Sequence, residues 1–209
     1  MNRLIVPNHP LIRHHLKRLR DASTPPAEFR RLVQRLAALL AYEATRDLPL
    51  TACRVKTPIT ETDAEEVTAR IGIVPILRAG LGMVDPVLNF LPDAEVWHLG
   101  LYRDEETARP VEYYSKLPPA DPVDTALVID PMLATGGSVA AAVDALRRWQ
   151  VPRVKVVSLI ASQPGVDSLL NQFPELQIIV AVVDPELNDR KFIVPGLGDA
   201  GDRIFNTMK

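Results

Sequence analysis

One segment of the chain joins an acidic residue to a turn that could bind a phosphate group. Residues 128–138 read VIDPMLATGGS, in which an apolar run ends at Asp130 and a glycine-rich turn precedes a helical pattern. A carboxylate at a strand end can accept hydrogen bonds from ribose hydroxyls, while Gly136 and Gly137 let the backbone approach a phosphate closely. The positive end of the following helix would add to this attraction. The segment predicts a sugar-phosphate site; without the acid, it would indicate only a helix start capped by Ser138.

A second possible anion site follows an earlier apolar run. Arg78 lies in ILRAGLGM, residues 76–83, beside small residues and two glycines, where the end of a strand would expose it. A guanidinium group can bind a phosphate through two parallel hydrogen bonds, and glycines permit unusual backbone conformations beside it. An arginine in such a place is more often a surface residue. The presence of the other candidate anion site favours the binding interpretation.

Two other nucleotide-binding motifs do not fit. The turn at residues 135–138 has no Gly-Lys-Ser/Thr, so a P-loop NTPase is not indicated. Residues 196–201, GLGDAG, match G-x-G-x-x-G, but too few residues follow for a crossover helix, a second strand and the acid expected ~20 residues later. A partial match begins at Gly80, but Asp85 stands where its third glycine would be.

The periodicity of the chain predicts the elements that position these loops. Apolar residues at helical spacing predict amphipathic helices over residues 27–46, 139–149 and 166–173. Short runs rich in Val, Ile and Leu predict five buried strands, at residues 71–77, 95–101, 125–130, 154–161 and 177–184. Apolar strands that alternate with such helices predict an α/β doubly wound fold, with a mainly parallel sheet and helices on both faces. Ligands bind beyond the carboxyl ends of strands in such sheets, where both candidate loops lie.

The remaining segments are less regular. Residues 102–117 mix charge, tyrosine and proline without periodicity, which predicts a hairpin arm or a flexible flap. His9, His14 and His15 lie in a basic stretch, which we interpret as a solvated face of an N-terminal helical segment rather than as metal ligands. Cys53 is expected to be a small buried apolar residue. No linker or repeat is visible, so we expect residues 1–209 to form a single domain.

Composition limits the class of protein. With 47% hydrophobic and 24% charged residues and a mean hydropathy of +0.04, the chain is predicted to be globular. A net charge of −2 and a pI near 6.1 argue against a nucleic-acid partner. No apolar run approaches the ~20 residues that cross a bilayer, and the N-terminus lacks the apolar core of a secretion signal. We therefore expect no membrane association and a cytoplasmic location.

Together these segments resemble the uracil phosphoribosyltransferase family. Four match that family's motifs in its order: VPILRAGLGM (74–83), YRDEET (102–107), VIDPMLATGGS (128–138) and PGLGDAGDRIF (195–205). The likeness extends to HPLIRHHLKRLRD (9–21) and YEATRDLP (42–49), which leaves only residues 50–70 without a recognisable motif. The chain departs from the family where Lys191 and Phe192 replace a frequent Gly-Tyr, and where residues 184–186, DPE, replace a more flexible sequence.

The resemblance implies a type I phosphoribosyltransferase fold and a reaction. Uracil and 5-phosphoribosyl-1-pyrophosphate (PRPP) would give UMP and diphosphate in pyrimidine salvage. The implied PRPP loop comprises Asp130, Pro131, Met132, Leu133, Ala134, Thr135, Gly136, Gly137 and Ser138. Within it, Asp130 would contact the ribose hydroxyls and residues 134–138 would surround the 5-phosphate. Arg78 and Arg103 would bind the pyrophosphate.

The resemblance also assigns the base and the cofactor. Ile193, Gly198, Asp199 and Ala200 would form the uracil pocket, mostly through backbone groups. Asp199 would also face PRPP or its magnesium, and it is the candidate for assisting removal of the N1 proton of uracil. Mg²⁺ would be held mainly through PRPP rather than by a dedicated protein cage.

The resemblance further implies a homo-oligomer, a dimer or tetramer, with activation by GTP in some members. Two other functions stay open. One is a sensor of PRPP or of a nucleotide built on the same fold. The other is a phosphoribosyltransferase for another base, against which residues 195–203, PGLGDAGDR, argue.

Overall fold

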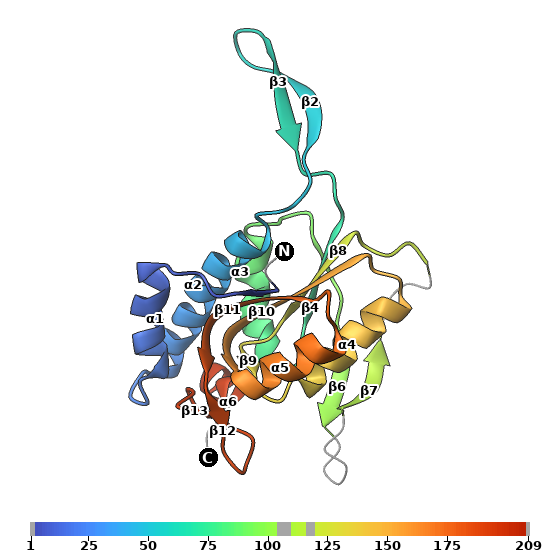
Figure 1. Cartoon of the computed structure of the whole chain (residues 1–209). Helices are drawn as coiled ribbons and strands as arrows, with labels where there is room; N and C mark the ends of the chain where they lie inside the picture. Colours follow the sequence, from blue (N-terminus) through green and yellow to red (C-terminus); the bar gives the residue numbers. More distant parts are fainter. Residues whose placement is uncertain (1–2, 104–109, 116–119, 208–209) are drawn as a thin grey trace.

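A parallel sheet forms the centre of the protein (Figure 1). The computed structural model describes residues 3–103, 110–115 and 120–207, and of residues 100–103 and 110–115 only the backbone. Across the sheet the strands run in the order β1 (Leu4–Ile5), β11 (Gln177–Asp184), β10 (Arg153–Ser162), β8 (Thr125–Ile129), β4 (Ile71–Pro75) and β5 (Glu95–Val96), and β9 (Met132–Leu133) also pairs with β10. Every one of these pairs is parallel, as predicted.

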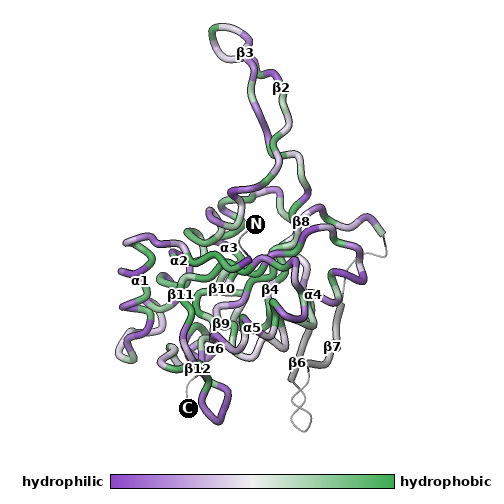
Figure 2. The backbone as a smooth tube through the Cα atoms, viewed as in Figure 1, coloured by the Kyte–Doolittle hydropathy of each residue, from purple (hydrophilic) through white to green (hydrophobic). Residues whose placement is uncertain are grey.

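Helices cover both faces of this sheet (Figure 1). One face carries α1 (Pro10–Arg20), α2 (Pro26–Ala44) and α3 (Val84–Leu88), and the other carries α4 (Gly137–Arg148) and α5 (Gln163–Gln172). Each side has its own apolar core, and the strands between them are hydrophobic along most of their length (Figure 2). A parallel sheet buried on both faces needs such strands. The predicted doubly wound architecture is confirmed.

The long helix α2 illustrates how the sequence forms these elements. Pro26 occupies its first turn, where a missing backbone N–H costs nothing, and Glu28 complements the positive end of the helix. Its apolar stripe, including Phe29, Leu36 and Leu40, is fully buried against the sheet. No helix in the described part of the chain is both long enough and apolar enough to cross a bilayer.

The predicted strand over residues 95–101 is wrong. Only Glu95–Val96 joins the central sheet, as β5. Residues Leu99–Arg103 form β6, which pairs antiparallel with β7 (Pro110–Ser115). Beyond Val96, the Trp97 N–H donates to the carbonyl of Ile73 at 2.9 Å, and one isolated parallel bridge joins Leu99 to Ile76. From there β6 satisfies its backbone groups with a strand that comes later in the chain. The described part of residues 102–117 thus forms a hairpin, one of the two predicted alternatives.

A second hairpin projects away from the sheet at the top of Figure 1. It consists of β2 (Thr51–Lys56) and β3 (Glu61–Glu66), which lie in the region without a recognisable motif. The predicted burial of Cys53 is wrong: this residue lies in β2 and is half-buried. Because the hairpin is clear of the core, neither of its faces is covered by the body of the protein.

The chain changes direction between β4 and β8. From β4 it continues to the neighbouring strand β5 on one side, whereas from β8 it continues to β10 and β11 on the other side. Loops that follow two such adjacent strands diverge, and the opening between them is where α/β sheets bind ligands. The short elements η1 (Ala79–Met83), β12 (Glu186–Leu187), β13 (Ile193–Val194) and α6 (Ala200–Phe205) complete the structure around this end of the sheet.

Candidate active site

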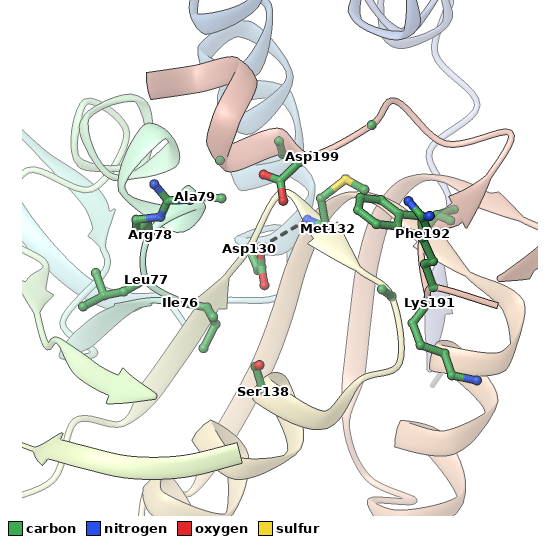
Figure 3. Close-up of a pocket in the computed structure, with 16 residues that line it drawn as sticks. Ile76, Leu77, Arg78, Ala79, Asp130, Met132, Ser138, Lys191, Phe192 and Asp199 are labelled. Atoms are coloured by element: carbon green, nitrogen blue, oxygen red, sulfur yellow. Dashed lines mark hydrogen bonds between the residues drawn. The ribbon is translucent and has the colours of Figure 1, made fainter. Parts of the chain in front are cut away.

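A cavity of about 410 Å³ opens at the carboxyl end of the sheet, where β4 and β8 lie side by side. Three segments form its walls: the loop after β4, the loop after β8, and residues 190–201 (Figure 3). The lining residues are Ile76, Leu77, Arg78, Ala79, Asp130, Met132, Ala134, Ser138, Arg190, Lys191, Phe192, Ile193, Gly198, Asp199, Ala200 and Gly201. The structure therefore brings the two loops with candidate anion sites together with residues 193–200, which contain the predicted uracil-binding residues and are called the base loop below.

Asp130 lies half-buried at the end of β8. Its Oδ1 accepts a hydrogen bond from the Met132 N–H at 3.2 Å. Burial is the main cause that raises the pKa of Asp130 from 3.8 to about 7, and the negative charge of Asp199 raises it further, against the effect of the Met132 bond. Figure 3 shows the Asp199 carboxylate beside Asp130. A ligand that donates hydrogen bonds or brings positive charge would favour the ionised form of Asp130.

The glycine turn of the predicted PRPP loop is supported from behind. Gly136 has a φ of 81°, which glycine adopts without strain. A β-carbon at this position would also lie 3.0 Å from the Cγ of Leu169. The buried Ser162 hydroxyl donates to the carbonyl of Ala134 at 2.6 Å and accepts from the Gly165 N–H at 2.9 Å. The turn is therefore held in place by α5 and by Ser162, the residue that precedes α5.

The residues of this loop have different surroundings. Met132, Ala134 and Ser138 line the cavity. Leu133 is fully buried, and the carbonyl of Pro131 accepts from the N–H groups of Leu159 and Ile160, so neither Leu133 nor Pro131 lines the cavity. Thr135 is exposed at the turn, and Gly137 begins α4. Gly136, not Ser138, occupies the cap position of this helix, and no side chain caps it.

Arg78 lies on the wall formed by the loop after β4. Its Nη2 is 3.3 Å from Oδ1 of Asp202, and its side chain is 61% exposed. Such an exposed ion pair contributes little stability, so a ligand anion can compete with Asp202 for Arg78. This loop packs tightly on β8, because a β-carbon on Gly80 would lie 2.6 Å from the carbonyl oxygen of Ile129. The other predicted cation, Arg103, lies in β6, and its side chain is outside the described part of the structure.

The predicted base-binding residues lie together on the third wall: Ile193, Gly198, Asp199 and Ala200. Gly198 has a φ of 80°, a conformation that suits glycine. Asp199 is the N-cap of α6, and its Oδ1 accepts from the Asp202 N–H at 2.9 Å. This bond fixes the orientation of the Asp199 carboxylate beside the cavity.

Comparison with known proteins agrees with this geometry. The model of the family "Uracil phosphoribosyltransferase" matches residues 6–207. The chain is similar to the uracil phosphoribosyltransferase of Roseiflexus castenholzii, with 54% identity over 99% of this chain and 100% of that protein, and to that of Geobacillus kaustophilus, with 48% identity over 99% and 100%. The chain belongs to the uracil phosphoribosyltransferase family. The predicted activity, transfer of the phosphoribosyl group of PRPP to uracil, is thereby confirmed.

Solved structures are similar as well. A protein from Aquifex aeolicus superposes with a TM-score of 0.91 and 37% identity, over 97% of both chains. A hypoxanthine phosphoribosyltransferase from Trypanosoma cruzi, with a TM-score of 0.51 and 9% identity over 76% of this chain and 75% of that chain, is similar in fold alone.

In this member of the family, the cavity also contains residues that the sequence analysis did not assign to a site. Arg190, Lys191 and Phe192 line it from the loop between β12 and β13. The side-chain oxygen of Asn188 closes this loop by accepting from the N–H groups of Arg190 and Phe192, at 3.0 and 2.9 Å. Lys191 has a φ of 64°, in the left-handed region that favours glycine. Two adjacent cations in a short polar stretch before the base loop were the signal that could have identified this wall.

Proposed function

We propose that the uracil phosphoribosyltransferase reaction takes place in this cavity, and that the chain functions as one domain around it. The proposal depends on one observation: the predicted PRPP loop and the base loop line the same cavity, although they come from distant parts of the sequence. Displacement at C1 of ribose requires the base, the sugar and the leaving group to be held in line, and a single cavity lined by both loops can do this.

PRPP is proposed to lie along the loop after β8. Asp130 would accept hydrogen bonds from the ribose hydroxyls, which would stabilise its ionised form. The backbone and hydroxyls of residues 134–138 and the N-terminus of α4 would surround the 5-phosphate. Because Pro131 and Leu133 face the interior, we assign them to shaping this loop rather than to contact with the substrate.

The pyrophosphate is proposed to bind the arginine side of the cavity. Arg78 would exchange its exposed ion pair with Asp202 for the pyrophosphate oxygens, whose negative charge increases as the bond to C1 breaks. Arg103 is also proposed to bind the pyrophosphate. The positive charge of these side chains would stabilise the leaving group more in the transition state than in the bound substrate.

Uracil is proposed to bind residues 193–200 through backbone donors and acceptors, with the ring of Phe192 at its edge. Asp199, held by its bond to the Asp202 N–H, would accept the N1 proton directly or through water. Its position beside Asp130 brings two carboxylates together in the cavity.

Magnesium fits this set of groups as a cofactor carried with PRPP. Among the described residues, no cluster of three or more His, Cys, Asp or Glu side chains could hold a metal by itself. Asp130 and Asp199 offer oxygen ligands of the kind that Mg²⁺ prefers, with the remaining ligands left to substrate and water. When bound, the ion would neutralise negative charge on the pyrophosphate.

Homo-oligomer formation is proposed from the resemblance and is supported by the β2–β3 hairpin. Ile59 at its tip is 94% exposed and Val55 is 46% exposed. A two-stranded hairpin is marginally stable by itself in water, so contact with a second copy would stabilise it. Sedimentation of the purified protein tests this proposal. Activation by GTP and a cytoplasmic location stay predictions from the sequence.

The experiment that tests the assignment of the cavity uses purified protein with PRPP, magnesium and each nucleobase in turn. UMP and diphosphate should form with uracil, and Asp199→Asn should lower turnover while retaining the cap of α6, because asparagine also caps helices. If Asp199→Asn and parent turn over equally, Asp199 has no role in proton removal. If PRPP binds but no base consumes it, the sensor function replaces this one.

A further inference from the structure

An ion pair lies behind the base loop, on the side away from the cavity. Arg20, at the end of α1, binds both carboxylate oxygens of Asp184, at the end of β11: Nη2 to Oδ1 at 2.6 Å and Nη1 to Oδ2 at 2.8 Å. The Asp184 side chain is 5% exposed and that of Arg20 is 25% exposed. Neither residue lines the cavity proposed for the reaction.

This pair holds both backbone polar groups of one residue of the base loop, Gly196. The Gly196 N–H donates to Oδ2 of Asp184 at 3.0 Å, and the Gly196 carbonyl accepts from Nη1 of Arg20 at 2.8 Å. Gly196 has a φ of 59°, and a β-carbon there would lie 2.1 Å from the carbonyl oxygen of Ile193. The loop therefore folds back on itself at Gly196, the residue whose backbone is hydrogen-bonded to Arg20 and Asp184.

The carbonyl of the next residue, Leu197, is held by another buried cation. Arg203, 6% exposed, donates from Nη1 to the Leu197 carbonyl at 2.8 Å and to the Leu19 carbonyl at 2.9 Å, and from Nη2 to the Asp21 carbonyl at 2.6 Å. Its guanidinium carbon lies 4.2 Å from the centre of the Phe29 ring. Arg203 thereby ties the base loop to the end of α1.

Packing alone does not determine the position of Gly198 and Asp199. Gly198 and Asp199 border the candidate active site and also a second cavity of about 410 Å³ on the other side of the loop, which Arg20 and Arg203 line. Leu197 and Ala200 are buried in the core, but Gly198 and Asp199 between them are exposed. Packing therefore restrains these two residues little, and hydrogen bonds to the adjacent backbone contribute to setting where they lie.

We propose that Arg20, Asp184 and Arg203 are positioning residues for base recognition, which set the backbone of Gly196 and Leu197 so that residues 198–200 present their polar groups to uracil. This inference rests on the proposed base site. It also gives a role to residues 9–21, the N-terminal motif to which no substrate contact is assigned. Arg20 and the carbonyls of Leu19 and Asp21, at the end of that motif, take part in the hydrogen bonds that hold the base loop. Uracil affinity should therefore depend on α1, although α1 does not line the cavity.

The test separates the base from PRPP. Arg20→Gln and Asp184→Asn should each raise the KM for uracil by ~10- to 100-fold, because small displacements of a binding group have effects of this size. The affinity for PRPP, measured by calorimetry without base and without magnesium, should stay within about threefold of the parent, because the protein contacts proposed for the phosphate, ribose and pyrophosphate lie on the other two walls of the cavity. Discrimination against cytosine should fall together with uracil affinity, because a displaced loop no longer matches the polar groups of either base.

Two further variants separate positioning from stability. Arg18→Gln removes an ion pair of the same helix, Arg18 with Glu28, whose side chains are 51% and 36% exposed, and should leave all constants within about twofold. Arg20→Lys should give an intermediate KM for uracil, because an ammonium group keeps the charge but lacks the planar fork that spans the carboxylate and the Gly196 carbonyl. If Asp184→Asn does not fold, the double variant Arg20→Gln/Asp184→Asn, which leaves no unpaired charge, replaces it.

The outcomes are distinct. An unchanged KM for uracil in Arg20→Gln, or an equal loss of uracil and PRPP affinity, overturns the positioning role. Failure of the parent to make UMP would instead overturn the proposed function. A raised uracil KM with intact PRPP affinity supports both.

Discussion

Replacement of Asp130 by asparagine should stabilise the ligand-free protein at neutral pH. Burial and the nearby charge of Asp199 raise the pKa of Asp130 from 3.8 to about 7, so the fold disfavours the ionised form. Asparagine retains the oxygen that accepts from the Met132 N–H and carries no charge. The substitution thus removes an electrostatic cost that substrate binding normally relieves.

The sign and size of the effect follow from linkage. Below about pH 3 the carboxyl is protonated in the folded and unfolded states alike, and the cost is absent. As pH rises toward 7, the unfolded state releases the proton first, so the parent loses stability. Above pH ~7 the cost is constant, and the difference between 3.8 and about 7 corresponds to at most ~4 kcal/mol.

Urea unfolding of parent and Asp130→Asn, without magnesium or substrates, measures this difference. The advantage of the variant should increase by ~2 kcal/mol between about pH 5.5 and about pH 8. PRPP binding should weaken at the same time, because asparagine cannot supply the charged acceptor.

Asp184→Asn is the matched control, because its carboxylate is buried against Arg20. Here the substitution should destabilise the protein by ~3 kcal/mol, since it leaves the cation without its partner. An Asp130→Asn protein that is less stable than the parent at about pH 8, or an advantage that does not change with pH, would refute the account of the Asp130 environment.

Four further results are expected. Arg78→Ala should lower turnover by ~10- to 100-fold and leave the affinity for ribose 5-phosphate nearly unchanged; equal losses in the two assays would contradict its place at the pyrophosphate. The kcat/KM for uracil should exceed that for cytosine by ~10⁴-fold, because cytosine mismatches two polar contacts. Comparable values for the two bases would place the base site elsewhere. Ser162→Ala should weaken PRPP binding in calorimetry without raising the KM for uracil, since its hydroxyl holds the Ala134 carbonyl; a raised uracil KM would argue against that separation. Lys191→Gly should raise the unfolding free energy by ~0.5–1 kcal/mol by relieving a left-handed backbone, whereas Lys191→Ala, which keeps the strain, should give no gain in the same urea titration.

Local patterns in the sequence determined the kinds of loop and element that this protein contains. Apolar runs identified four strands of the central sheet, β4, β8, β10 and β11, and the acid and glycines of residues 128–138 identified a loop suited to a sugar phosphate. Both signals lie within a few consecutive residues. The family motifs likewise identified the activity. The strand predicted over residues 95–101 failed, because the choice between a parallel and an antiparallel partner is made by strands distant in sequence.

Only the tertiary structure decided how these loops act together. The order of the strands places the loops after β4 and β8 side by side and brings Asp199 close enough to raise the pKa of Asp130. It showed that Leu133 is buried, whereas Arg190, which no motif singled out, lines the cavity. It also paired Arg20 with Asp184 across 164 positions of the chain. Such contacts depend on the packing of α1 and β11 against each other, and no local periodicity in either segment contains that information.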